Sequence, residues 1–168
     1  MAVYGTVQEI LENGIHIAND DESDPYREIV LNITEDTLIV DAVEGSLKTL
    51  ADIKDGESIH AYTSMAMTRS LPPISNAAVI FFNIPADYAA PEYASILKIE
   101  EQDDHLVLTM DRNIYYHVGD QTPIADFSTG EEMKATDLKE GMRLISWYQI
   151  VLQSFPPQAT PDKILVIR

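Results

Sequence analysis

Short apolar runs of strand length recur along the whole chain and are separated by turn sequences. The first two runs alternate apolar and polar residues on either side of Asn13-Gly14, which is a strong hairpin signal. No stretch shows the apolar period of a helix of useful length. Strands are predicted at residues 4–10, 15–17, 29–33, 58–62 and 78–84, and again at residues 105–108, 114–118, 143–147 and 163–167.

Two related sequences, T-L-A-D-I-K-D-G and K-A-T-D-L-K-E-G, interrupt the strand pattern. Each is typical of one short helical turn that ends at a glycine, here Gly56 and Gly141, because glycine adopts a positive φ without steric cost. Each turn is followed by a predicted strand. The two halves of the chain therefore contain one small helical turn each.

The second half of the chain repeats landmarks of the first half in the same order. With an offset of 85 positions, residues 29–62 align with residues 114–147 without a gap, and eight of the 34 pairs are identical. An offset of 84 then aligns S-L-P-P at residues 70–73 with S-F-P-P at residues 154–157. Landmarks in one common order indicate a duplicated domain rather than a shared short motif.

The predicted strands and turns indicate an all-β chain of two domains, residues 1–88 and 89–168. The proline-bounded segment 83–92 is the expected linker. Each domain is expected to be a small, mostly antiparallel β-barrel of the OB-like type with one helical turn, because closure removes the edges of a sheet. Proline cannot donate to a ladder, so each S-x-P-P segment is expected where strand pairing stops.

The end of the chain reads as a strand, then S-F-P-P-Q, then a terminal strand within P-D-K-I-L-V-I. This order resembles the C-terminal signature of a family of small bacterial lipoproteins and cell-envelope modules of unknown function. Gln158 matches the glutamine that follows the prolines in that family, whereas the first copy has Ile74 there. The resemblance implies a location outside the cytoplasm and implies no catalytic residue.

Acidic residues dominate the charge of the chain, with 28 Asp and Glu against 11 Lys and Arg, for a net charge of −17. Such a protein repels polyphosphates, so nucleic acid and anionic membranes are not expected as partners. The lack of cysteine excludes disulfides and thiolate chemistry. No apolar stretch is long enough to span a membrane and no signal peptide is recognisable, so we expect an exported mature chain, with a cytoplasmic chain as the alternative.

Carboxylates and histidines offer few candidates for chemistry. Residues 19–24 form an acidic cluster, but an EF-hand is excluded because Pro25 and Leu31 stand where glycine and a bidentate glutamate are needed. We interpret the cluster as a solvated loop, with a weak calcium site as the alternative. The four histidines lie on separate predicted strands without ligand spacing and are interpreted as half-exposed strand residues. No catalytic residue, metal site or cofactor is predicted.

Five residues are candidates for ligand binding. Tyr62 and Trp147 occupy the same position in the two copies, where an aromatic ring serves either as a binding surface or as core. Alternation in the strand before the first S-x-P-P places Met65, Met67 and Arg69 on one side. Methionines beside an arginine are typical of a contact surface, and burial in the barrel wall is the alternative.

These observations favour a non-catalytic, monomeric binding or spacing module of the bacterial cell envelope. Its partner would be a protein, a peptide or a glycan. One alternative is a hydrolase or a calcium-dependent enzyme with a site between the two barrels. Another is a proteinase inhibitor that presents residues 65–71 as a bait loop.

Overall fold

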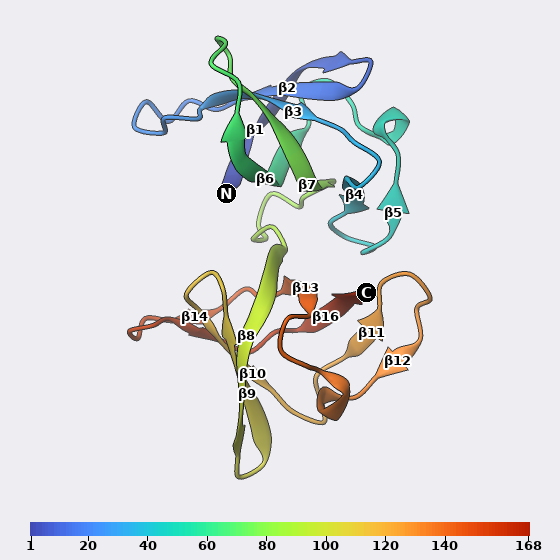
Figure 1. Cartoon of the computed structure of the whole chain (residues 1–168), viewed down its shortest axis with the longest axis vertical. Coiled ribbons are helices and arrows are strands. Elements are labelled where there is room, and N and C mark those ends of the chain that lie inside the picture. Colours follow the sequence, from blue (N-terminus) through green and yellow to red (C-terminus); the bar gives the residue numbers. More distant parts are fainter. The chain divides into compact units, whose positions relative to one another are not determined.

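The protein is an all-β chain that divides into two compact units, Met1–Ala90 and Pro91–Arg168. The structure is a computed structural model that describes residues 1–168, and each unit is considered by itself (Figure 1). The first unit contains β1 (Ala2–Leu11), β2 (Gly14–Ala18), β3 (Glu28–Asn32), β4 (Leu38–Asp41), β5 (Leu47–Lys48), the 3₁₀ turn η1 (Leu50–Asp52), β6 (Ser58–Met67) and β7 (Ile74–Phe82). None of the helices combines the length and apolar composition needed to span a bilayer.

The first unit contains a closed barrel of five strands. Its sheet runs β3-β2-β1-β6-β7-β4-β5, and a further pairing between β3 and β7 closes the ring. The first half of β7 pairs in parallel with β3 and its second half pairs in parallel with β4. The closed ring surrounds a core of aliphatic side chains, including Ile15, Ile17, Ile29, Leu31, Ile59 and Ile80.

The second unit contains nine strands and one 3₁₀ turn. It contains β8 (Glu92–Gln102), β9 (His105–Met110), β10 (Tyr115–Val118), β11 (Ile124–Asp126), β12 (Glu132–Met133), η2 (Ala135–Asp137), β13 (Arg143–Trp147), β14 (Val151–Leu152), β15 (Gln158–Ala159) and β16 (Lys163–Ile167). The sheet order is β12-β11-β16-β13-β8-β9-β10-β15-β14. β10 pairs in parallel with β15, and β11 pairs in parallel with β16. β15 and β16 thus make the two pairings that the single strand β7 makes in the first unit.

The predicted hairpins and helical turns are confirmed. Residues 12–13 connect β1 to β2, and residues 103–104 connect β8 to β9. The helical turns η1 and η2 are followed by Gly56 with φ of 79° and Gly141 with φ of 90°. At these angles a β-branched side chain is strained, so these two positions require glycine.

Two predictions about the last hairpin of the first unit are wrong. β7 begins at Ile74 rather than at residue 78, because the amide of Val30 in β3 already donates to the carbonyl of Pro73 at 2.9 Å. The alternation expected from Thr63 to Arg69 is broken by register shifts in the β6–β7 ladder. As a result Thr63 is buried while Met65 is exposed.

Candidate functional site

The last hairpin of the second unit contains an interruption that we call the ladder gap. β13 pairs with β16 as far as Trp147 and Lys163, and β14 pairs with β15 from Val151 and Ala159 onward. Residues 148–150 and 160–162 lie between these pairs and outside the ladder. One backbone bond, from the amide of Asp162 to the carbonyl of Trp147 at 2.7 Å, marks the edge of the gap.

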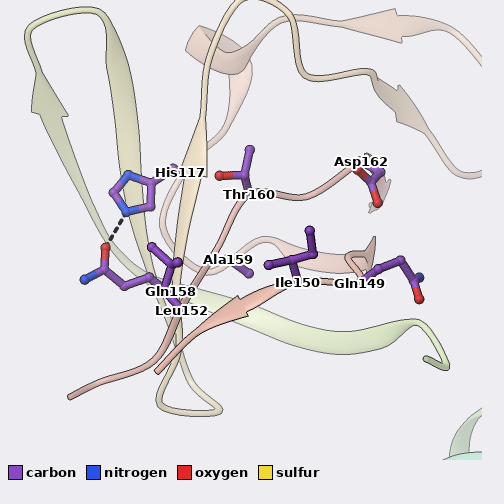
Figure 2. Close-up of a pocket in the computed structure, with 8 residues that line it drawn as sticks. All are labelled: His117, Gln149, Ile150, Leu152, Gln158, Ala159, Thr160 and Asp162. Atoms are coloured by element: carbon purple, nitrogen blue, oxygen red, sulfur yellow. Dashed lines mark hydrogen bonds between the residues drawn. The ribbon is translucent and has the colours of Figure 1, made fainter. Parts of the chain in front are cut away.

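A pocket of about 490 Å³ opens at the ladder gap (Figure 2). This volume is within the range of small-ligand sites. Two aliphatic side chains, Ile150 and Leu152, lie on the β14 arm, most groups of the opposite arm are polar, and Asp162 is the one acidic residue in the lining. The lining residues are His117, Gln149, Ile150, Leu152, Gln158, Ala159, Thr160 and Asp162.

The first unit closes the corresponding place with a serine. Ser75 follows Pro73 by two residues, as Ala159 follows Pro157, and it is 2% exposed. Its hydroxyl donates a bifurcated bond to the carbonyls of Ser64 at 2.7 Å and Ala66 at 2.9 Å, which ties the two arms together. Alanine has no hydroxyl, so the second unit lacks this tie.

Ser75→Ala is expected to lower the free energy of unfolding of the first unit by about 1–2 kcal/mol, because it leaves two carbonyls without the buried donor. Urea unfolding measures the change. Ser58→Ala serves as the control, because Ser58 is an exposed serine of the same unit on strand β6. A Ser75→Ala variant as stable as the parent would show that the hydroxyl does not hold the arms.

A chain of hydrogen bonds reaches the pocket from the tip of the β8–β9 hairpin. Asp104 Oδ1 lies 2.8 Å from His105 Nδ1, and His105 Nε2 lies 2.9 Å from His117 Nδ1. His117 Nε2 lies 2.6 Å from Gln158 Oε1 (Figure 2). The bond to His105 and its charge lower the pKa of Asp104, so this carboxylate is ionised and acts as an acceptor. The chain connects a surface carboxylate to two groups in the pocket wall.

A second polar cluster, partly buried, lies next to the ladder gap. The hydroxyls of Tyr116 and Tyr148 both donate to the Glu92 carboxylate, Tyr148 at 3.0 Å, and Tyr116 pairs with Ala159 in the β10–β15 ladder. Burial, and then the nearby Glu92 charge, raise the pKa of Tyr116 well above its ordinary value. Tyr116 therefore remains a hydrogen-bond donor at neutral pH.

The first unit has apolar residues at the positions that correspond to Glu92 and Tyr116. Val3 pairs with Ala61 in the β1–β6 ladder as Glu92 pairs with Ser146 in the β8–β13 ladder. Leu31 stands where Tyr116 stands in the alignment. The cluster of Glu92 with two tyrosines and the open gap thus occur together, in the second unit.

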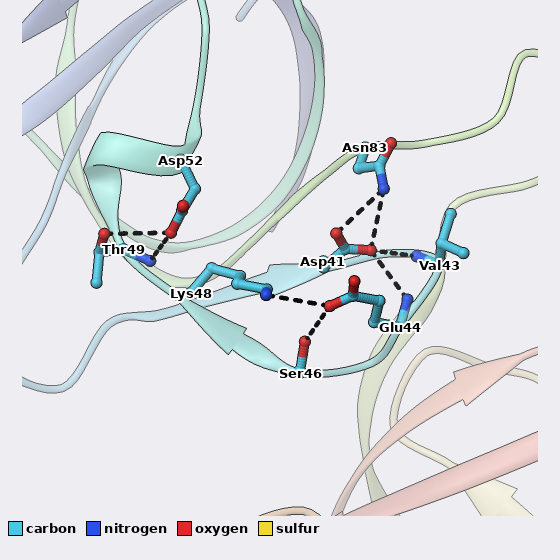
Figure 3. A network of polar contacts seen from close by, with 8 residues as sticks. All are labelled: Asp41, Val43, Glu44, Ser46, Lys48, Thr49, Asp52 and Asn83. Carbon is cyan, nitrogen blue, oxygen red and sulfur yellow. Dashed lines mark hydrogen bonds and ion pairs between the residues drawn. The ribbon is translucent and has the colours of Figure 1, made fainter.

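A buried aspartate turn is common to both units and explains some of the acidic side chains. Asp41 Oδ1 accepts from the amides of Val43 at 2.8 Å and Glu44 at 2.9 Å, and Asn83 donates to the same carboxylate (Figure 3). Burial acts to raise the pKa of Asp41, but these hydrogen bonds outweigh it and the pKa is lowered. Asp126 accepts two amides in the same way. These carboxylates are occupied in shaping a turn.

The acidic loop after β2 is likewise bonded to itself. The side chain of Asp21 accepts from the amide and hydroxyl of Ser23 at 3.0 and 2.6 Å, and Asp24 accepts from the amide of Tyr26 at 2.8 Å. Hydrogen bonds from Ser23 lower the pKa of Asp21. The described residues include no group of three or more His, Cys, Asp or Glu side chains placed to hold a metal ion.

The five predicted binding residues do not form one site. Tyr62 is 6% exposed and lies edge-on to Phe81 at 6.3 Å, so the core interpretation applies to it. Trp147 belongs to the other unit, where the ammonium of Lys163 lies 5.0 Å from its ring centroid.

Residues 65–71 run from the end of strand β6 into the exposed turn that precedes β7. Met65 is 82% exposed, which contradicts the alternative of burial in the wall, whereas Met67 is half-buried. Arg69 is exposed. The loop is held by bonds from the Thr68 amide to the Ile74 carbonyl and from the Ser70 hydroxyl to the Pro72 carbonyl, both at 2.9 Å.

Sequence reasoning missed the residues of the ladder gap. His105 and His117 do lie on separate strands, but these strands are neighbours and the side chains meet diagonally. Residues 144–161 contain no charged residue and no histidine, in a chain that is 23% charged. This uncharged run was the available signal for an unusual surface.

Comparison of the chain with protein-family models, with curated proteins and with solved structures finds no match.

Proposed function

We propose that this chain is a non-catalytic binding module of the bacterial cell envelope, with its ligand site at the ladder gap of the second unit. One observation carries the proposal. The same hairpin is tied shut by Ser75 in one unit and has Ala159 beside a pocket of about 490 Å³ in the other. Two related scaffolds that differ at such a point are typical of one structural copy and one functional copy.

The module is built, in this proposal, from two tandem OB-like barrels that arose by duplication. In the second barrel the final wall strand is split into β15 and β16, and the ladder gap is the place of the split. Support comes from the common offset of 85 that relates Asp41 to Asp126 and Gly56 to Gly141, each pair in the same turn geometry. The partner pairings β3–β7 and β10–β15 are both parallel.

The ligand class that fits the gap best is a short extended peptide with apolar and basic side chains. Ile150 and Leu152 are 78% and 61% exposed beside the pocket. Their burial against apolar side chains of a bound peptide contributes favourable binding free energy. Asp162 and the net charge of −17 favour a cation. β14 is the last strand of its sheet, so a peptide strand can add to its edge.

A short peptide that alternates lysine and valine tests this proposal with ¹⁵N-labelled protein and NMR. Amide shifts are expected to concentrate in residues 149–152 and 158–162 and to persist at about 0.15 M salt, where diffuse charge attraction is screened. A peptide that alternates glutamate and valine is the control. Shifts confined to the acidic loop 19–24, or no shifts at all, would refute the site.

The envelope location rests on the resemblance of the S-F-P-P-Q segment and terminal strand to cell-envelope modules. Fractionation of a bacterium that expresses the native gene, followed by antibody detection, tests the location. Recovery in the envelope fraction supports it. Recovery with cytoplasmic markers would refute it without affecting the peptide site.

A second candidate function is proteinase inhibition by residues 65–71. The specific observation is that this loop is both exposed, with Leu71 97% exposed, and braced by its own hydrogen bonds. A rigid loop with Arg69 in its middle suits a proteinase that cleaves after arginine. Inhibition of trypsin that is lost in Arg69→Ala would support this function, and simple cleavage after Arg69 would refute it.

A further inference from the structure

The hydrogen-bond chain beside the ladder gap contains two imidazoles in direct contact. Their ring centroids lie 5.0 Å apart, and both side chains are half-buried. One end of the chain is the Asp104 carboxylate and the other is the side-chain amide of Gln158, a residue that lines the pocket. A change of protonation in the rings can therefore reach the pocket through Gln158.

The number of N–H groups that the three hydrogen bonds require indicates the protonation state of the two imidazole rings. Asp104 Oδ1 and Gln158 Oε1 are acceptors, so His105 Nδ1 and His117 Nε2 must both donate. The bond between the rings needs one more N–H. Two neutral imidazoles carry two N–H groups, so this arrangement holds three and corresponds to one imidazolium in the pair.

Two neutral rings satisfy the same three contacts only if the donor and acceptor roles reverse in the bond between the rings and in the bond to Gln158. The Gln158 amide must turn so that its NH₂ donates to His117 Nε2. His117 Nδ1 then donates to His105 Nε2, and His105 Nδ1 continues to donate to Asp104. Loss of one proton thus moves the hydrogen of His117 from Nε2 to Nδ1 and turns the Gln158 carbonyl away from His117.

We propose that the His105–His117 pair is a proton switch that sets, through Gln158, whether the ladder gap presents a hydrogen-bond donor or an acceptor to its ligand. The carbonyl form favours ammonium and peptide N–H groups, and the protonated form opposes a cationic ligand. The effect on ligand binding rests on the peptide site proposed above. The switch itself is a property of the free protein.

Two acidic residues lie at the ends of the region around the pair. Asp104 adjoins His105 on the hairpin side, and Asp162 lies in the 160–162 arm across the pocket. The β14 arm supplies Gln149, Ile150 and Leu152, none of which titrates, and β15 supplies Gln158 and Ala159. In the first unit Asn32 and Asn76 form a side-chain bond at 2.7 Å near the corresponding place, so this switch is confined to the second unit.

The direct test is ¹⁵N NMR of the histidine rings of the free protein from about pH 5 to pH 8.5, a range that brackets the ordinary titration of imidazole. His117 is expected to stay neutral while its hydrogen moves from Nε2 to Nδ1 as His105 loses its proton. Gln158→Leu is expected to abolish this tautomer reversal, and Asn76→Leu in the first unit is the control. Two rings that titrate independently, with no tautomer reversal, would overturn the switch.

Titration with the lysine–valine peptide then separates the switch from the binding site. Affinity is expected to be about fivefold higher at pH 8 than at pH 5.5, a common size for coupled sites, and nearly independent of pH in Gln158→Leu. Tautomer reversal without peptide binding at any pH would refute the peptide site and leave the switch standing. Tautomer reversal with binding that does not depend on pH would overturn the link between them.

Discussion

Glu92→Ala is expected to lower the free energy of unfolding of the second unit by about 2–3 kcal/mol, because it removes the charged acceptor of the Tyr116 hydroxyl. Tyr116 has no exposed surface, so water cannot replace the carboxylate without entering the core. Trp147 is the single tryptophan of the chain and lies in the second unit. Its fluorescence during urea unfolding therefore reports on this unit.

Glu92→Gln is the matched control, since its amide oxygen still accepts a hydrogen bond, and a loss about half as large is expected. The corresponding change in the first unit, Val3→Ala, removes apolar volume but no polar partner. An unchanged midpoint in Glu92→Ala would show that the carboxylate does not support the buried tyrosine.

Alkaline pH is expected to unfold the second unit through Tyr116. Its folded-state pKa is raised by burial and by Glu92 above the ordinary value of about 10. A group whose pKa is higher in the folded than in the unfolded chain contributes its full stabilisation below the unfolded-state pKa. For Tyr116 this stabilisation is lost as the pH rises above about 10. The loss amounts to about 1.4 kcal/mol per pH unit until the folded group also titrates.

The difference between the parent and Tyr116→Phe isolates this contribution, because the other seven tyrosines and the lysines titrate in both proteins. The free energy of unfolding of the parent should fall more steeply with pH than that of the variant above pH 10. Equal slopes would mean that the Tyr116 hydroxyl ionises as easily in the folded as in the unfolded chain.

The sequence was sufficient to predict the features that depend on local chemistry. Asn13-Gly14 marks a hairpin, and Gly56 and Gly141 follow helical turns, where their positive φ is a backbone geometry that few other residues adopt. The start of β7 was misplaced because Pro73 lacks an amide but still offers a carbonyl, which β3 uses. Register shifts in β6 were not visible in the alternation of Met65 and Met67.

The candidate site could not be predicted from the sequence because it depends on contacts between residues of different strands. Ser75 and Ala159 are small residues in similar contexts, and only the carbonyls of Ser64 and Ala66 show what the hydroxyl does. His105 and His117 are 12 residues apart on antiparallel neighbours, so their contact follows from the hairpin register. Sequence spacing alone does not reveal such diagonal pairs.

The concentration of unusual features in one unit is the strongest reason to place the site there. The second unit combines an open ladder, a half-buried carboxylate shared by two tyrosines, and the paired histidines. Each has a plainer counterpart in the first unit. Buried polar networks are costly unless fully satisfied, so they are retained where they serve a purpose beyond stability.

Affinity for the lysine–valine peptide, compared between Leu152→Asn and Leu71→Asn, tests the ladder-gap site most directly. Both leucines are well exposed, at 61% and 97%, so neither change should affect stability by more than about 0.5 kcal/mol. Because Leu152 lines the pocket, Leu152→Asn should weaken binding about tenfold, as expected for a leucine side chain buried by the ligand. Leu71→Asn should bind like the parent, and equal affinities of the two variants would contradict a binding site at the ladder gap.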